Sequence, residues 1–199
     1  MSTIIYLVRH GKVENPKQVI YGRLPGYGLS EEGKRQAHAL GKHLSKQAIH
    51  AIYTSPLERA RETASIISSY HNNIAVIHDE LLLEVNSPYL EGKPFTYADT
   101  VKWDFYQEKY YSLGQERKED LLERMEKAIE KIRLKHTGKS VVVVSHGDPI
   151  MITVSKLLNK PFLSWGNDFM QDQIYVHPAK GFRLVFDASG AVEVAKLEL

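Results

Sequence analysis

The chain has 199 residues, enough for one compact domain, and its content of 43% hydrophobic and 25% charged residues is ordinary for a globular protein. Its net charge of +2 and the lack of any block of like charge argue against a nucleic-acid partner. The absence of cysteine excludes disulfide bonds, thiolate nucleophiles and thiolate zinc sites.

The chain opens on an apolar run, 4–8, which predicts a buried parallel strand. This run is too short for the apolar region of a signal peptide and ends at Arg9 without a cleavage site. A glycine-rich loop follows, and then Ser30 is a suitable N-cap for a helix with apolar residues at helical spacing as far as Leu44.

A second apolar run, 49–53, predicts another buried strand. Directly after it, we expect Ser55 to be the N-cap of a helix, with Pro56 as its first residue and Glu58 completing a capping box. A weaker strand is expected over 75–77.

The second half of the chain repeats this order of elements. Residues 118–135 predict a long amphipathic helix, and the run 141–144 predicts a third buried strand. Asp148 and Pro149 then indicate another capped helix, and the alternating tail 182–194 predicts an antiparallel hairpin at a sheet edge. Recurring strand–helix units predict an α/β fold with a doubly wound, mainly parallel sheet. No apolar run is long enough to cross a membrane, so we expect a cytoplasmic protein without a membrane partner.

Chemically active residues follow the three main predicted strands. Arg9 and His10 come after the first strand, Ser55 after the second and His146 after the third. Ligands bind outside the carboxyl ends of the strands in open α/β sheets, so we expect these side chains to converge. Arg59 lies one turn into the following helix and should reach back to the same edge, because helical side chains tilt toward the N-terminus.

Two guanidiniums and two imidazoles suit phosphoryl transfer. Arginines bind the equatorial oxygens of a phosphoryl group through paired contacts, and the helix N-termini after Ser55 and Gly147 add backbone N–H donors. Imidazole is a competent nucleophile near neutral pH. Because the arginines supply the positive charge, we expect neither a metal nor another cofactor.

Five sequence elements carry a family resemblance. Arg9-His10-Gly11, the segment 55–64 (SPLERARETA) and the segment 145–147 (SHG) resemble the histidine phosphatase superfamily, the phosphoglycerate mutase-like group. The segments 22–37 and 83–92 also resemble motifs of this family, and all five elements occur in the family's order. The ordered set is far more specific than Arg-His-Gly alone.

The resemblance implies a three-layer α/β/α sandwich around a mainly parallel sheet. It also implies that His10 is a phosphohistidine nucleophile and that Glu84 is a general acid, then a general base. Arg9, Arg59 and His146 would bind the phosphoryl group. Further substrate contacts are expected from residues in or near the motifs, namely Asn15, Gly22, Arg23 and Gly147.

The chain departs from the family pattern at three positions. Lys12 stands where Glu or Gln is usual, and we expect this change to favour more anionic substrates. Asn15 matches the family's asparagine but comes one position early. Pro88 replaces a glycine in the element after Glu84.

We expect residues 1–199 to form a single domain with an insert at about 86–117. The insert is rich in aromatic residues, and the helical spacing of Trp103, Tyr106 and Tyr110 favours core packing as their role. The alternative is that the insert covers the active site and selects the leaving group.

The expected function is that of a metal-independent phosphomonoester hydrolase acting on a small phosphorylated molecule. One alternative is a phosphoglycerate-type mutase, although mutases of this family tend to be longer than 199 residues, with extra sequence around the pocket. The other alternative is a binding or regulatory homologue that keeps the pocket but lacks turnover.

Overall fold

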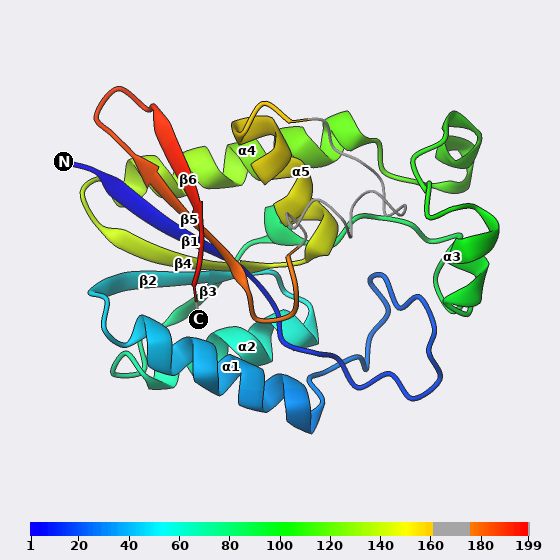
Figure 1. Cartoon of the computed structure of the whole chain (residues 1–199), viewed down its shortest axis with the longest axis horizontal. Coiled ribbons are helices and arrows are strands. Elements are labelled where there is room, and N and C mark those ends of the chain that lie inside the picture. The colour runs from blue at the N-terminus through cyan, green and yellow to red at the C-terminus, as the bar shows by residue number, and fades with distance from the viewer. Residues whose placement is uncertain (161–175, 199) are drawn as a thin grey trace.

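The structure, a computed structural model, describes residues 1–160 and 176–198 (Figure 1). The described strands are β1 (Thr3–Arg9), β2 (Ile49–Thr54), β3 (Val76–His78), β4 (Ser140–Ser145), β5 (Gly181–Phe186) and β6 (Val192–Lys196). They form a six-stranded sheet in the order β3-β2-β4-β1-β5-β6. The pairs β3–β2, β2–β4 and β4–β1 are parallel, whereas β5 pairs antiparallel with β1 and β6. The sheet therefore confirms the predicted mainly parallel arrangement with an antiparallel hairpin at one edge.

Helices cover both faces of this sheet (Figure 1). The long helices are α1 (Glu31–Leu44), α2 (Glu58–Ser69), α4 (Lys118–Lys135) and α5 (Gly147–Leu157), and shorter ones are η1 (Glu80–Leu82), α3 (Thr96–Thr100) and η2 (Glu108–Leu113). Helices α1 and α2 pack on one face, and α4 and α5 pack on the other. This confirms the expected three-layer α/β/α sandwich.

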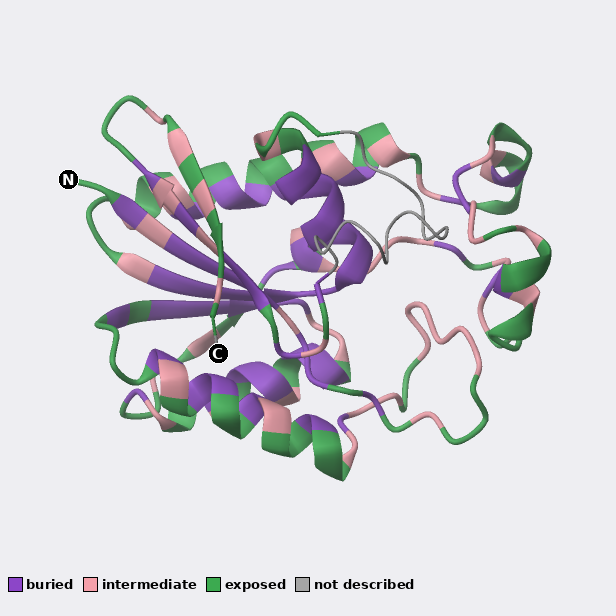
Figure 2. Cartoon of the chain, viewed as in Figure 1, coloured by how far each residue is buried: buried purple, intermediate pink, exposed green. Residues whose placement is uncertain are grey.

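The two cores explain why the central strands are apolar without interruption. In β1, Ile5 and Leu7 pack on the side of α4 and α5, whereas Tyr6 and Val8 pack on the side of α1 and α2. Alternate side chains of a strand point to opposite faces, so a strand covered on both faces must be apolar at every position. Figure 2 shows this continuous burial along the central strands.

The predicted N-cap of α1 is confirmed, but the predicted N-cap of α2 is wrong. The Ser30 side chain accepts a hydrogen bond from Gly33 N at 3.1 Å. Ser55 is not the N-cap of α2, because the chain stays extended at Leu57 and the helix begins at Glu58. The Ser55 hydroxyl instead lies close to a histidine ring of the candidate site, described below.

The predicted cap of α5 is also wrong. The helix begins at Gly147, with His146 in the N-cap position, so Asp148 lies inside the first turn. The Asp148 carboxylate is turned into the protein, where it accepts a hydrogen bond from the Tyr106 hydroxyl at 2.6 Å. A carboxylate in the first turn still faces the positive end of the helix dipole.

Residues 86–117 lie beyond the ends toward which β1 and β4 run, at the right of Figure 1. Leu90, Ala98 and Phe105 form a small core of their own within this segment. The expected core packing is confirmed for Tyr106 and Tyr110, which are buried, and Trp103 is partly buried against the small core. The helical spacing of the three residues does not correspond to one helix, because α3 ends at Thr100 and Trp103 has a φ of 58°. Among the described residues, no helix is both long and apolar enough to span a membrane.

Candidate active site

Three neighbouring strands bring the predicted histidines to one edge of the sheet. The register of β1 on β4 pairs Arg9 with Ser145, and His10 N donates to Ser145 O at 3.1 Å. On the other side of β4, Ser55 N donates to Val144 O at 3.0 Å. The residues that follow β1, β2 and β4 are therefore level with one another, and the rings of His10 and His146 lie 5.1 Å apart between centroids.

The His10 ring has a defined tautomer. Its Nδ1 lies 2.7 Å from Gly11 O, and a carbonyl oxygen only accepts hydrogen bonds, so the proton must be on Nδ1. The lone pair of the ring is then on Nε2. Arg59 Nε donates a hydrogen bond to this Nε2 at 3.2 Å. The site therefore presents a nucleophilic nitrogen directly beside a guanidinium.

Arg59 is almost fully buried and held on several sides. Its Nη2 donates to Gly22 O at 2.8 Å, and its guanidinium lies 4.8 Å from the centre of the Tyr21 ring. Gly22 has a φ of 42°, a backbone conformation that glycine adopts at no steric cost. These contacts fix the orientation of a cation that would bind a phosphoryl oxygen.

A short chain of hydrogen bonds connects the first motif to α2. Gly11 N donates to Thr63 Oγ1 at 3.1 Å, and the Thr63 hydroxyl donates to Arg59 O at 2.7 Å. A Cβ at Gly11 would lie 2.5 Å from Gly33 O, at the start of α1, which only glycine avoids. The loop that carries His10 is thus packed against both helices on one face of the sheet.

His146 is buried beside His10. Its Nε2 lies 2.7 Å from Ser55 Oγ. Its Nδ1 is buried and has no hydrogen-bond partner within residues 1–160 and 176–198. Buried polar atoms are nearly always satisfied, so this nitrogen is suited to contact a bound ligand.

Burial lowers the pKa of both histidines well below the usual value, and the positive charge of Arg59 lowers each pKa further. Both rings are therefore neutral at pH 7. A neutral His10 has a lone pair available on Nε2, whereas an imidazolium would have none.

Arg9, the neighbour of His10 in the chain, and Glu84 line a cavity of about 380 Å³. The two histidine rings and Arg59 are not among its lining residues. Arg9 Nη1 donates to Val176 O at 3.0 Å. Glu84 is half-buried, and burial together with the negative charge of Asp148 raises its pKa to about 7, against the opposing effect of Arg59. A carboxyl with this pKa can donate or accept a proton at neutral pH.

Asp148 lines the same cavity, and sequence analysis considered it only as a helix cap. Its hydrogen bond from Tyr106 favours the ionised carboxylate. In turn, its charge holds Glu84 in the protonated form over a wider pH range.

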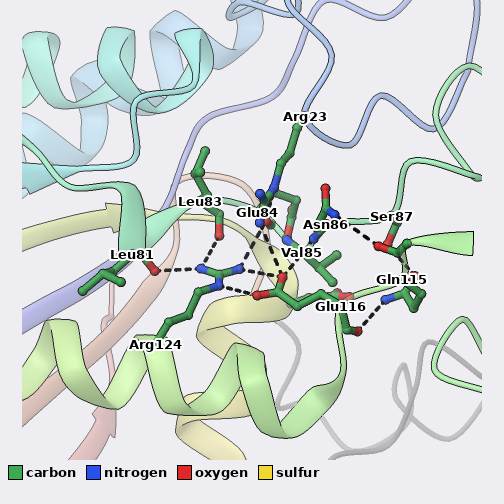
Figure 3. A network of polar contacts seen from close by, with 12 residues as sticks. Arg23, Leu81, Leu83, Glu84, Val85, Asn86, Ser87, Gln115, Glu116 and Arg124 are labelled. Atoms are coloured by element: carbon green, nitrogen blue, oxygen red, sulfur yellow. Dashed lines mark hydrogen bonds and ion pairs between the residues drawn. The ribbon is translucent and has the colours of Figure 1, made fainter. Parts of the chain in front are cut away.

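Arg124 of α4 holds the loop that carries Glu84 (Figure 3). Its Nη1 donates to Leu81 O at 2.7 Å and to Leu83 O at 2.8 Å, and its Nη2 donates to Glu84 O at 3.2 Å. Its Nε donates to Glu116 Oε1 at 2.6 Å. Sequence analysis missed this residue, because an arginine on an amphipathic helix gives no signal of the carbonyls it will meet.

Glu116 extends this network to the loop after Glu84 and to the predicted site residue Arg23. Glu116 Oε2 accepts from Asn86 N at 2.9 Å and lies 3.4 Å from Arg23 Nη2. Arg23 Nε donates to Glu84 O at 2.8 Å. The Arg23 guanidinium thus contacts the loop of the candidate acid, and Arg23 is not among the residues that line the cavity.

The other predicted substrate-contacting residues differ in whether they lie at the site. Gly22 lines the cavity, and Gly147 is the first residue of α5 beside His146. The Asn15 side chain bonds to its own loop: its amide donates to Val19 O at 2.9 Å, and its carbonyl accepts from Val19 N at 3.2 Å. Asn15 therefore closes a turn.

Lys12 does not supply charge to the cavity. Its ammonium forms an ion pair with Glu32 of α1, and both side chains are about half exposed. Lys12 is also not among the lining residues. The departure from the family pattern at this position thus places a surface ion pair outside the cavity.

The segment 86–117 supplies much of the cavity wall. Six of its residues line the cavity, namely Ser87, Leu90, Phe95, Trp103, Phe105 and Gln115. The remaining lining residues include Ile20, Tyr21 and Val85. The cavity therefore has a charged end at the sheet edge and a largely apolar wall facing it.

Comparisons with known proteins agree with this fold and place the chain in a family. A model of the histidine phosphatase superfamily (branch 1) matches residues 5–177. An uncharacterized protein of Mycobacterium tuberculosis is 33% identical over 199 residues, covering 89% of this chain and 98% of the relative. Phosphoserine phosphatase 1 of Hydrogenobacter thermophilus is 32% identical, covering 82% of each chain. Phosphoglycerate mutase-like protein 4 of Arabidopsis thaliana is 33% identical, covering 73% of this chain and 67% of the relative.

Among solved structures, YhfR of Bacillus stearothermophilus matches with a TM-score of 0.83 and 28% identity, covering 98% of this chain and 96% of that one. Fold and sheet-edge residues together define the phosphoglycerate mutase-like class of α/β proteins. The chain belongs to the histidine phosphatase superfamily, branch 1, in which its relatives have the names of phosphatases and of mutases.

Proposed function

We propose that this protein is a phosphomonoester hydrolase that holds the phosphoryl group covalently on His10 during turnover. The observation that carries the proposal is the unprotonated Nε2 of His10, which accepts a hydrogen bond from Arg59 and lies beside the His146 ring. A nucleophile between a cation and a second imidazole is the arrangement that phosphoryl transfer needs, because the reaction depends mainly on positioning and on stabilising the charge of the oxygens.

In the first step, the Nε2 lone pair of His10 attacks phosphorus. The N–P bond forms as the bond from phosphorus to the ester oxygen breaks, and protonated Glu84 gives its proton to the departing oxygen. Arg9 and Arg59 stabilise the equatorial oxygens, and the Nδ1 of His146 contacts the same group. The product alcohol then leaves the cavity.

In the second step, water attacks the phosphohistidine. Glu84, now ionised, accepts a proton from the water as the new O–P bond forms and the N–P bond breaks. Inorganic phosphate leaves and His10 is neutral again. The pKa of Glu84, about 7, suits both roles of this carboxyl.

The charges around the cavity favour hydrolysis over the mutase reaction. A phosphoglycerate carries a carboxylate in addition to its phosphate, and a mutase must hold both groups. Among the described residues, Arg9 is the only cation lining the cavity, and two carboxyls, Glu84 and Asp148, line it as well. We also propose that the chain is a single domain in which the insert at about 86–117 covers this cavity.

The direct test is release of phosphate from an aryl phosphate by the purified protein and by His10→Ala. We expect near-complete loss of activity in His10→Ala and no loss in the control His78→Ala, because His78 is exposed on β3. Turnover of labelled substrate, quenched rapidly, should leave an acid-labile, base-stable phosphoenzyme only when His10 is present.

Three results would contradict the proposal. Retention of most of the activity by His10→Ala would reject phosphohistidine as the intermediate. Transfer of phosphate between phosphoglycerates, faster than phosphate release and dependent on priming by a bisphosphate, would instead support the mutase. Tight binding of phosphorylated compounds without release of phosphate would support the non-catalytic alternative.

A further inference from the structure

We infer that the ester cleaved at this site has an apolar, ring-sized leaving group that carries no second anionic group. The inference rests on the proposed function and adds the chemistry of the substrate beyond its phosphate. It comes from the apolar wall of the cavity. The proposed function places the phosphoryl group at Arg9 and therefore assigns this wall to the leaving group.

Aromatic side chains of the insert form this wall. Trp103 packs against Phe105 with ring centroids 5.9 Å apart and against Phe95 with centroids 6.4 Å apart. All three rings line the cavity, together with the aliphatic side chains of Val85 and Leu90. Such a surface binds apolar groups and aromatic rings, and the volume of about 380 Å³ is sufficient for a small organic group.

The polar residues of the wall already bond to each other. The Ser87 hydroxyl donates to Gln115 Oε1 at 2.7 Å, and Gln115 Nε2 donates to Glu116 O at 3.0 Å. These two bonds use part of the hydrogen-bonding capacity of Ser87 and Gln115, so the wall has few groups left to bind the several hydroxyl or ammonium groups of a sugar or an amino acid. An apolar leaving group leaves both bonds intact.

The charges exclude a second anion. The Lys12 ammonium is paired with Glu32 at the surface, and the Arg23 guanidinium contacts Glu116. Among the described lining residues Arg9 is the only cation, and the proposed function assigns it to the phosphoryl group. A carboxylate or second phosphate on the leaving group would lose its hydration and face Glu84 and Asp148.

The test compares esters with similar phenolic leaving groups. We expect kcat/KM to fall in the order 1-naphthyl phosphate, phenyl phosphate, 4-carboxyphenyl phosphate. The first and last should differ by at least about 10-fold, because small differences in fit to an apolar pocket change kcat/KM by roughly 10–200-fold. The compound 3-phosphoglycerate should be as poor a substrate as 4-carboxyphenyl phosphate.

Substitutions in the cavity wall test whether the wall causes the preference for uncharged leaving groups. Phe95 is 38% exposed, so Phe95→Arg should fold and should raise kcat/KM for 4-carboxyphenyl phosphate relative to phenyl phosphate. The control Leu113→Arg adds the same charge to the same insert at a residue that is 53% exposed and outside the cavity lining, and should leave the ratio unchanged. Trp103→Leu adds no charge and should reduce the ratio of 1-naphthyl to phenyl phosphate.

The outcomes separate this inference from the proposed function. If 4-carboxyphenyl phosphate or 3-phosphoglycerate is hydrolysed through His10 as efficiently as phenyl phosphate, the substrate class is wrong and the hydrolase remains. An unchanged 1-naphthyl preference in Trp103→Leu, together with an unchanged ratio in Phe95→Arg, also rejects the role of the wall. If none of the four esters releases phosphate, the hydrolase and the substrate class both fail.

Discussion

The Nε of Arg59 donates a hydrogen bond to Nε2 of His10 over 3.2 Å. This single contact occupies the lone pair that the proposed reaction uses. A phosphoryl group entering the site must take the place of His10 as the acceptor for the guanidinium, which then faces phosphate oxygens. Under the proposed function Arg59 marks the position of the phosphate. Burial, together with the charge of Arg59, lowers the pKa of His10 and keeps the ring neutral.

Replacing Arg59 should greatly reduce the rate. Removing one fixed charge donor from such a site costs about 10²–10³ in rate, so we expect Arg59→Ala to lose at least that much in kcat/KM for phenyl phosphate. Arg61→Ala is the matched control, because Arg61 lies on the same helix and is exposed. Equal activity of the two variants would mean that Arg59 does not bind the phosphoryl group.

Replacing Glu84 should affect poor leaving groups most. A phenolate with a low pKa leaves without protonation, so the general acid contributes little to its departure. We expect Glu84→Gln to reduce kcat/KM by about 10²-fold or more for phenyl phosphate and clearly less for 4-nitrophenyl phosphate. Steady-state assays with both esters measure this difference, and an equal reduction for both would argue that Glu84 does not protonate the leaving oxygen.

Replacing Asp148 should shift the pH profile. Glu84 must be protonated in the first step, and its pKa of about 7 means that kcat/KM should decline as the pH rises through 7. The negative charge of Asp148 raises this pKa, while Arg59 and Arg9 lower it. Asp148→Asn removes the raising charge, so the alkaline limb should move to lower pH by about one unit.

The profile of kcat/KM against pH, measured for the wild type, Asp148→Asn and the exposed control Asp120→Asn, checks this shift. The control should follow the wild type. A shift toward higher pH in Asp148→Asn would reject the proposed coupling between the two carboxyls.

Replacing Arg124 should impair proton transfer by Glu84 without disturbing the residues that bind the phosphoryl group. Arg124→Ala removes three bonds to backbone carbonyls around Glu84 and leaves the mostly buried Glu116 without its main partner. We expect kcat to fall by about 10²-fold, because small misplacements of a reacting group have effects of this size. KM should change little, since Arg59 and His10 are held by other contacts.

The free energy of unfolding should differ between Arg124→Ala and Lys131→Ala, two variants of α4. We expect Arg124→Ala to lose about 1.5–3 kcal/mol of unfolding free energy, the range for a hydrogen bond to a charged group. Lys131→Ala removes an ion pair between an exposed ammonium and the buried Asp79, which also accepts a hydrogen bond from Leu81 N, and should lose less than about 1 kcal/mol. Arg124→Lys keeps the charge but not the planar fork, so it should recover only part of kcat. An unchanged kcat in Arg124→Ala would show that Glu84 is positioned without it.

Sequence predicted the elements best where local signals were strong. The apolar runs became β1, β2 and β4, and the predicted helix over 118–135 has the same bounds as α4. The Ser30 cap was also predicted, because a serine three residues before a backbone N–H donor forms a local bond. Hydrophobic spacing and short-range capping are properties of neighbouring residues, so the sequence contains them directly.

Helix-cap predictions were wrong where the side chain contacts a residue that is distant in the sequence. Ser55 and Asp148 both resemble helix caps, but they contact His146 and Tyr106, which are far from them in sequence. The helical spacing of Trp103, Tyr106 and Tyr110 does not produce one helix, because Trp103 has a φ of 58° and packs on neighbouring rings of the insert. Each of these exceptions lies at or beside the candidate site.

Sequence alone determined that a motif follows each main buried strand. Because parallel strands end at the same edge of a sheet, this predicted that His10, Arg59 and His146 lie together. Only the tertiary structure decided the tautomer of His10, the pKa of Glu84 and the chemistry of the cavity wall. Tautomer and pKa depend on atoms a few ångströms away in space, and the cavity wall depends on where an insert folds back. No spacing of residues along a chain specifies such distances.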